Sequence, residues 1–592
     1  MNLYIYIVLK EEEEYGMESL NDIVSSINGV LWSSVIIVLL VGAGVYFTIR
    51  TKAVQLRYFG TMFKLIANTA GTKTEGNEIS PFQAFCVSTA SRVGVGNIAG
   101  IAIAIVSGGP GAIFWMWFIA VIGSATGFVE STLAQIYKVP REDGNGFRGG
   151  PAYYLKNGLG HKLWAAIFAI LISVTYGMIY NSVQSNTISL ALNHALGADR
   201  MVVGAVVTVL AMAVICGGMG RIARVTEWMV PLMAGLYIVI ALGIMIYNIT
   251  DMPHVFYIIF RDAFDWQAAF GGGMGAAVLT GFKRGLFSNE AGEGSVPNAA
   301  ATADANHPVV QGLIQAFGVY VDTLFICSAS AFIVLLTGDY ASTGLTGIEL
   351  VQWDLAQYFG PMAPKAVSIL IFLFAFTSLI GNYYYGEINI GHLTHKKWPL
   401  NLFRVLIAVM IFWGSIADLP LVWNLADLFM AFMVLTNVTA ILLLFPQVRT
   451  CLKDYEDQLA KGIKLPIFHK KVLKNQKGIV WWDNENNFNG AKKIYKTTNY
   501  FWDTASKTSV NSEGATVSTD WFKSLDYSAI LDGVKSLGTI TRNADGTIAL
   551  GDVFALTDKA PAGVGADFSH DKLTASVSPV IGESVTDRKS VV

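Results

Sequence analysis

The sequence has few charged side chains and few residues suited to acid–base or metal chemistry. Charged residues make up 14% of the 592 residues, whereas an ordinary globular domain carries about a quarter. There are eight histidines and four cysteines, and the cysteines show no CxxC spacing. The formal net charge is −2. This composition argues against a disulfide framework, a metal site and a nucleic-acid partner.

Long apolar runs are abundant, and hydrophobic residues make up 53% of the chain. A helix needs about 20 apolar residues to cross the bilayer core. The runs predict an all-α polytopic membrane protein with eleven transmembrane helices and the lipid bilayer as its surroundings. The predicted helices lie at 30–49, 81–107, 110–137, 163–194, 201–218, 228–248, 266–290, 311–337, 361–390, 402–417 and 422–446.

Lysine and arginine concentrate in alternate loops between these helices. One set of loops is rich in them, with Arg50, Lys52, Lys138, Arg141, Arg221, Arg224, Lys396, Lys397, Arg449 and Lys453 among its members. The opposite loops carry only Arg200, Arg261 and Lys365. Because positive residues favour cytoplasmic loops, this alternation predicts the N-terminus outside and the C-terminus inside.

Composition divides the chain into three parts. Residues 1–29 are predicted to be an extracellular segment, since the short apolar start is followed by Glu11–Glu14 and resembles no signal peptide. Residues 30–452 form the predicted transmembrane domain. Residues 453–592 are polar and are predicted to be a cytoplasmic tail, to which we assign no role. Within the tail, 537–556 is typical of a β-hairpin that turns at Asp545-Gly546.

Two predicted spans contain clustered glycines that weaken a helix. In 88–100, Gly94 and Gly96 flank Val95, and Arg92 and Asn97 are polar groups at membrane depth. Glycine alone also suits tight helix packing, but buried polar groups favour a functional site. In 271–295, three successive glycines come first and a polar run then ends at Gly292 and Gly294. The alternative here is a helix end with a polar cytoplasmic loop.

The two breaks lie five helices apart, in the second and seventh predicted spans. This spacing is typical of an inverted repeat of five helices, in which discontinuous helices bind a ligand near the membrane midplane. The half-helix N-termini offer N–H groups to a carboxylate, and the unwound carbonyls can hold a cation.

Several other polar side chains lie within apolar runs. Thr377 and Ser378 carry hydroxyls suited to an alkali cation, although such hydroxyls also bond to their own helix. The amides of Gln184 and Asn186 either bind substrate or join helices. Glu130 is a candidate for an ion pair with Arg92 or for a gate, and Asp322 and Glu387 have no assigned role.

Together these segments resemble the alanine/glycine:cation symporter family. The resemblance rests on SRVGVGNIAG (91–100), GGPGAIFWMW (108–117), GGPAYYL (149–155), FKRGLFSNEAGEGSVPNAAA (282–301) and NYYYGE (382–387). It covers about 20–450 and leaves out the tail. It implies a leucine-transporter-type core of two inverted five-helix repeats preceded by one extra helix, and sodium- or proton-coupled import of small amino acids across a plasma membrane of bacterial type.

The resemblance also implies site residues. The backbone carbonyls of Ala90 and Val93 and the hydroxyls of Thr377 and Ser378 are expected to hold the co-transported sodium ion. The expected substrate-binding residues are Val95, Gly96, Asn97, Gln184, Phe287 and Asn382. Val95 stands where many alanine/glycine carriers have threonine, and Asn382 where some have tryptophan. These two departures make glutamine a candidate substrate beside alanine and glycine.

Other function classes fit the sequence less well. Proton coupling is the nearest alternative, but the Thr377–Ser378 pair offers no titratable group at the ion site. A membrane enzyme would show clustered histidine, cysteine or carboxylate residues near one bilayer face. A channel would show a continuous polar stripe. Neither pattern is present, and no obligate protein partner is evident from the sequence.

Overall fold

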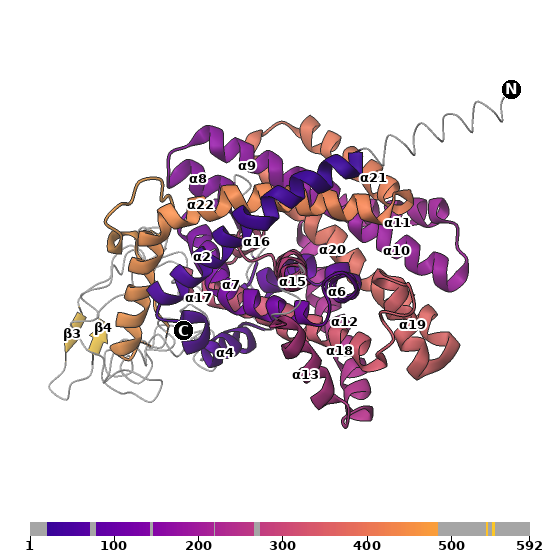
Figure 1. The fold of residues 1–592 in the computed structure, drawn as a ribbon. Coiled ribbons are helices and arrows are strands. Elements are labelled where there is room, and N and C mark those ends of the chain that lie inside the picture. Colours follow the sequence, from indigo (N-terminus) through magenta and orange to yellow (C-terminus); the bar gives the residue numbers. More distant parts are fainter. Residues whose placement is uncertain are drawn as a thin grey trace. The chain divides into compact units, whose positions relative to one another are not determined.

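The structure is a computed structural model, and it describes residues 20–70, 79–141, 146–217, 219–265, 273–463, 465–482, 540–542 and 548–550 (Figure 1). Within these residues the chain is almost entirely helical. Two compact units are distinguished, Met1–Val448 and Arg449–Val592.

The first unit begins with one long apolar helix. It runs over Leu20–Arg50 and contains a wide π-helical turn, η1 (Leu31–Val35), followed by α2 (Ile36–Arg50). Two short helices follow, α3 (Val54–Arg57) and α4 (Phe59–Thr69).

The second predicted span is a broken helix. The half-helices α5 (Pro81–Arg92) and α6 (Val95–Gly108) are separated at Val93-Gly94 and are buried over most of their length. α7 (Gly111–Ile136) packs on both α15 and α17. The strands β1 (Val139–Pro140) and β2 (Phe147–Arg148) then pair antiparallel and lead to α8 (Pro151–Asn157).

The next group of helices completes the first half of the unit. It comprises α9 (Lys162–Val174), the π-helical turn η2 (Thr175–Tyr180), α10 (Asn181–Leu196), α11 (Arg200–Ile215), α12 (Met219–Tyr247) and α13 (Met252–Ala263). The first three form one continuous span, and α12 packs on α5 and α20.

The second half begins with another interrupted helix, α15 (Gly273–Asn289), followed by the short α16 (Val296–Ala300). The remaining helices are α17 (Pro308–Tyr320), η3 (Val321–Cys327), α18 (Ser328–Thr337), α19 (Gly347–Phe359), η4 (Gly360–Met362), α20 (Ala363–Leu393), α21 (Lys397–Ile416) and α22 (Leu419–Ala460). α6 and α15 lie in the middle of the bundle, as Figure 1 shows.

The second unit contains the 3-10 turn η5 (Lys470–Val472) and the strands β3 (Ile540–Arg542) and β4 (Ile548–Leu550). The strands pair antiparallel, with Ile540 opposite Leu550, which confirms the predicted hairpin. Its predicted turn, Asp545-Gly546, lies outside the described residues.

The span count follows from helix length and composition. Among the described residues, nine helices are long and apolar enough to cross a membrane. The other two predicted spans correspond to α11 and α15, which have 16 and 17 residues. The prediction of an all-α polytopic membrane protein is therefore confirmed. The helices α13 and α19 were not predicted.

Candidate functional site

The break in the second span is built by Val93 and Gly94. Val93 has ψ 86° and Gly94 has ψ −148°, so neither continues the helix of α5. Asn97 caps the start of α6, because its Oδ1 accepts a hydrogen bond of 2.9 Å from the Gly94 N–H. The interruption leaves backbone carbonyls at the end of α5 available to other partners.

Ser378 of α20 reaches these carbonyls. Its Oγ lies 2.9 Å from the carbonyl oxygen of Ala90 and 3.4 Å from that of Val93. Thr377 points to its own helix instead, donating to the Phe374 carbonyl at 2.8 Å. Three of the four predicted sodium ligands are thus brought together, and Thr377 would have to turn from Phe374 to join them.

Gly94 and Gly96 allow side chains to approach the break closely. A Cβ on Gly94 would collide with Ser378 Oγ, and one on Gly96 would lie 2.7 Å from the Phe287 ring. Gln184 accepts a hydrogen bond of 3.1 Å from the Val95 N–H at the start of α6. The structure therefore gathers five of the six predicted substrate-binding residues around the start of α6: Val95, Gly96, Asn97, Gln184 and Phe287.

The sixth predicted residue, Asn382, lies one helical turn after Ser378 and faces the end of α5. Its Oδ1 lies 2.7 Å from Ser91 Oγ, and its Nδ2 donates to Asn181 Oδ1 at 3.1 Å. Ser91 Oγ is also 2.8 Å from Glu290 Oε1. Asn382 thus belongs to a buried polar network beside the break.

Aromatic rings cover the start of α6. The ring of Phe287 lies 4.7 Å from that of Tyr180 and 4.8 Å from that of Trp423, measured between centroids. Trp423 also approaches Gly100, where a Cβ would lie 3.2 Å from its ring. The three rings thus pack together beside the start of α6.

Asp322 is a site residue that sequence reasoning left unassigned. Its Oδ1 accepts from Asn97 Nδ2 at 2.6 Å, and its Oδ2 accepts from Ser288 Oγ at 2.6 Å. Asn97 also donates to Ser288 Oγ at 2.8 Å. The carboxylate thus fixes the orientation of Asn97. A carboxylate in an apolar run was the available signal, since such groups need partners at membrane depth.

The second break lies between α15 and α16. Glu290 has φ 57°, and Gly292 and Gly294 have φ 100° and 82°, so the chain turns sharply there. Glu290 is 1% exposed, which excludes the alternative of a polar cytoplasmic loop. The predicted helix terminus is confirmed, while Gly271 and Gly272 lie outside the described residues.

Glu130 holds this second break. Its Oε1 accepts from the Gly292 N–H at 3.3 Å, and its Oε2 accepts from Asn437 Nδ2 at 2.8 Å. Arg92 instead donates to the Gln315 carbonyl at 3.2 Å. Among the described residues the two side chains form no ion pair with each other, so the predicted Arg92–Glu130 pair is wrong.

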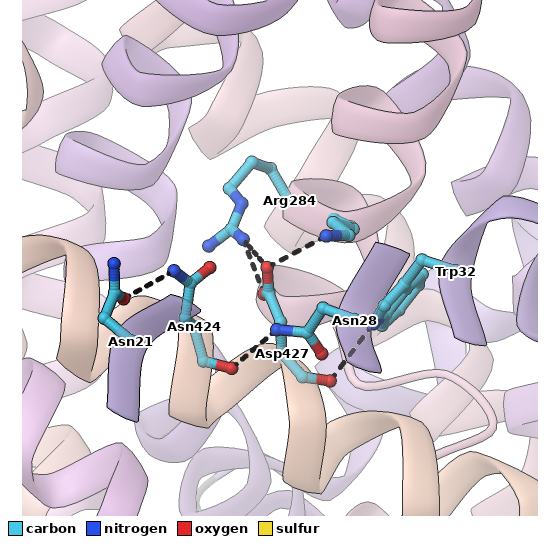
Figure 2. Close-up of polar contacts among 7 residues, drawn as sticks. Asn21, Asn28, Trp32, Arg284, Asn424 and Asp427 are labelled. Carbon is cyan, nitrogen blue, oxygen red and sulfur yellow. Dashed lines mark hydrogen bonds and ion pairs between the residues drawn. The ribbon is translucent and has the colours of Figure 1, made fainter. Parts of the chain in front are cut away.

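An ion pair joins α15 to α22 next to the aromatic rings (Figure 2). Arg284 Nη2 lies 2.5 and 2.6 Å from the two carboxylate oxygens of Asp427, and both side chains are buried. The guanidinium also lies 4.5 Å from the centroid of the Trp423 ring. The pair therefore fixes one of the three rings that cover the start of α6.

The first span is fastened to the same part of α22. Trp32 Nε1 donates to the Asp427 carbonyl at 3.1 Å, and Asn28 Nδ2 donates to the Asn424 carbonyl at 2.8 Å. Figure 2 shows these two side chains meeting α22 beside Arg284. The first span is thus hydrogen-bonded to the same turns of α22 that carry Asp427 of the ion pair.

Known proteins resemble this chain over the whole helical part. The probable sodium/glutamine symporter GlnT of Bacillus subtilis is 52% identical over 463 residues, covering 78% of this chain and 96% of the relative. The amino-acid carrier protein AlsT of Bacillus subtilis is 46% identical, covering 79% and 99%. The sodium/alanine symporter AgcS of Methanococcus maripaludis is 37% identical, covering 71% and 94%.

These names are those of membrane transporters rather than enzymes. The sequence profile of the sodium:alanine symporter family matches residues 17–470, which include both helix breaks and all ten predicted site residues. The chain belongs to the sodium:alanine symporter family.

Proposed function

We propose that this chain is a sodium-coupled symporter that imports a small neutral amino acid through the broken helix α5–α6. The observation that carries the assignment is the approach of Ser378 Oγ to the Ala90 carbonyl oxygen, at 2.9 Å. Hydroxyl and carbonyl oxygens are hard ligands of the kind that alkali cations prefer. Sodium is bound there by the carbonyls of Ala90 and Val93 and by the hydroxyl of Ser378, with Thr377 as the fourth ligand.

The substrate occupies the neighbouring start of α6. Its carboxylate faces the backbone N–H groups there, which carry the positive end of the half-helix dipole. Gln184 now bonds the Val95 N–H, so a bound carboxylate displaces that amide. Gly96, Asn97 and Phe287 complete the wall, and Asn382 approaches from α20.

Glutamine is the substrate that we place first. Val95 presents no hydroxyl to the pocket, and Asn382 adds an amide that can bond a substrate side-chain amide. The relative named as a probable sodium/glutamine symporter is 52% identical to this chain, which supports the same choice. Alanine and glycine are the alternatives, and a carrier named for sodium and alanine is 37% identical.

Coupling requires only that sodium favour the substrate-competent state. A coupling free energy of about 1–3 kcal/mol suffices, and the membrane potential adds about 2.3 kcal/mol per charge per 100 mV. Proton coupling remains the alternative to be tested. Asp322, which accepts a hydrogen bond of 2.6 Å from Asn97, is the titratable group that proton coupling would use.

The order of the helices supports two repeats of five spans, which would move relative to each other during transport. The spans that begin with α5 and with α15 are both interrupted, and each begins a set of five. We place the N-terminus outside and the C-terminus inside a plasma membrane. Residues 1–29 are then an extracellular segment, 30–452 the symporter domain and 453–592 a cytoplasmic tail.

The test is uptake of labelled glutamine, alanine and glycine into proteoliposomes that contain the full chain. One arm has an inward sodium gradient, a second has choline in place of sodium, and a third has a proton gradient without sodium. Accumulation only with sodium is expected, with glutamine preferred. Accumulation driven by protons alone would replace the ion assignment, and accumulation of none of the three would overturn the substrate class.

A further inference from the structure

A cavity opens between the β1–β2 hairpin, α8 and the end of α20. Its volume is about 110 Å³, several times the roughly 10–15 Å³ that one water requires. It is lined by Val139, Pro140, Arg148, Tyr153, Lys156, Gly391, His392 and His395. None of these residues belongs to the two helix breaks.

The charged groups that line this cavity are of one sign. Arg148 and Lys156 are cationic, and the rings of His392 and His395 carry N–H groups that can donate hydrogen bonds. No aspartate or glutamate among the described residues lines the cavity. Like charges that converge on one space repel each other, and a bound anion removes that repulsion.

Three separate segments bring these groups together. Arg148 belongs to β2, Lys156 to the last turn of α8, and His392 to the last turn of α20. Arg148 Nη1 lies over Gly391, 3.4 Å from where a Cβ would be. The His392 ring packs on Tyr153 at 4.6 Å between centroids. Basic residues whose only role is to set the membrane topology need not converge on one cavity, and their side chains would extend into solvent.

We propose that this cavity binds a phosphate group, carried by an anionic phospholipid or by a soluble phosphate. A guanidinium matches the oxygens of a phosphate in a two-pronged geometry, and an ammonium adds a point charge. Basic pockets between transmembrane helices on the cytoplasmic side are suited to lipid phosphate head groups. The proposed topology decides only from which leaflet of the membrane a lipid would enter the cavity. Phosphate binding itself does not depend on that topology.

The experiment measures thermal unfolding of the full chain in detergent, because a ligand of the folded state raises Tm. The probes are short-chain phosphatidylglycerol, and potassium phosphate against potassium chloride at equal ionic strength. The test variant is Arg148→Gln/Lys156→Gln. The matched control is Lys64→Gln/Lys162→Gln, which removes the same two charges from exposed positions outside the cavity.

The Tm of wild type and of the control variant is expected to rise with phosphatidylglycerol. The test variant should need at least about tenfold more phosphatidylglycerol to reach half of that rise. A gain with the lipid alone assigns a head group, and a gain with potassium phosphate also assigns the soluble ion. Equal gains in all three proteins, or no gain in wild type with either probe, would overturn the proposal.

A second variant protects the test against misfolding. Lys156 is exposed, so Lys156→Gln alone leaves the packing of α8 intact. It is expected to lose part of the Tm gain. An unchanged gain in this variant would also count against the cavity as the binding site.

Discussion

Ser378 Oγ lies within hydrogen-bond distance of the Ala90 and Val93 carbonyls. Among the described residues, no other side-chain oxygen does so. Replacing Ser378 with alanine removes one oxygen ligand of the proposed sodium site. We expect the sodium concentration for half-maximal uptake in Ser378→Ala to rise about tenfold, with recovery at saturating sodium. A sodium titration of labelled amino-acid uptake measures this change.

The matched control is Thr439→Ala. Thr439 is exposed on α22, and its hydroxyl donates to the Leu435 carbonyl of its own helix at 2.7 Å. Its loss should leave the sodium dependence unchanged. An unaltered sodium dependence in Ser378→Ala as well would rule out Ser378 as a ligand.

Gly96 faces the Phe287 ring with no room for a side chain. The added Cβ of Gly96→Ala would lie 2.7 Å from that ring, so the ring must shift and the start of α6 must move. We expect uptake to fall at least about tenfold, because overpacking a site of this kind costs about 1–3 kcal/mol. Gly42→Ala in α2 is the control, since no atom lies within 4 Å of its added Cβ. Equal uptake by the two variants would show that this wall tolerates a methyl group.

At the residue scale, the sequence predicted backbone breaks better than side-chain partners. Gly94 and Gly96 could be found because two glycines flanking one residue in an apolar run are a local signal. The partner of Asn97 could not be found, because Asp322 is 225 positions away and no local pattern links them. The prediction of an Arg92–Glu130 pair was wrong for the same reason, because opposite charges in a sequence do not show how far apart the two side chains lie in the fold.

At the scale of elements, eleven spans were predicted from hydropathy, and all have matching helices. Their inner irregularities were not predicted. The wide turns η2 and η3 each interrupt a span without a proline inside them. Such turns are rare and carry no proline signal here, so hydropathy alone could not locate them. For the same reason, apolar runs could not distinguish the helix α13 from a loop.

The ion pair between α15 and α22 yields a prediction about elements. Removing one partner leaves a buried charge, which costs about 3–5 kcal/mol. We expect Arg284→Gln and Asp427→Asn each to lower Tm in detergent, and the double variant to lower it by less than the sum. Lys64→Gln is the control, because Lys64 is exposed on α4, whereas Lys283 Nζ also lies 3.4 Å from Asp427 Oδ2. Strict additivity of the two substitutions would mean that the pair does not couple the helices.

At the scale of the whole molecule, an odd number of spans predicts that the two termini lie on opposite sides of the membrane. In a Cys216→Ser background, a membrane-impermeant maleimide added to intact cells should label Ser342→Cys but not Lys397→Cys. Ser342 and Lys397 are both exposed; Ser342 lies in the α18–α19 connection, and Lys397 is the first residue of α21, directly after the α20–α21 connection. The reverse labelling pattern would invert the proposed orientation.

The tail can be tested as a separate part of the chain. The family profile ends at residue 470, and the matched portion of this chain already covers 94–99% of three relatives. We therefore expect a chain ending at residue 482 to retain sodium-dependent uptake within about twofold of the full chain. Immunoblots normalise the amount in the membrane. Loss of uptake at normal abundance would assign the tail a role in transport.

The close approaches at Gly94, Gly96 and Gly100 also constrain how such a carrier can diverge. Each of these positions faces a side chain of another helix at a distance that excludes a methyl group unless that neighbour moves. One wall of the pocket is thus closed to single substitutions. New cargo preferences must then arise at other positions near the break, such as Val95 and Asn382. Duplicated copies of this gene could change substrate there while keeping the same ion and the same broken helix.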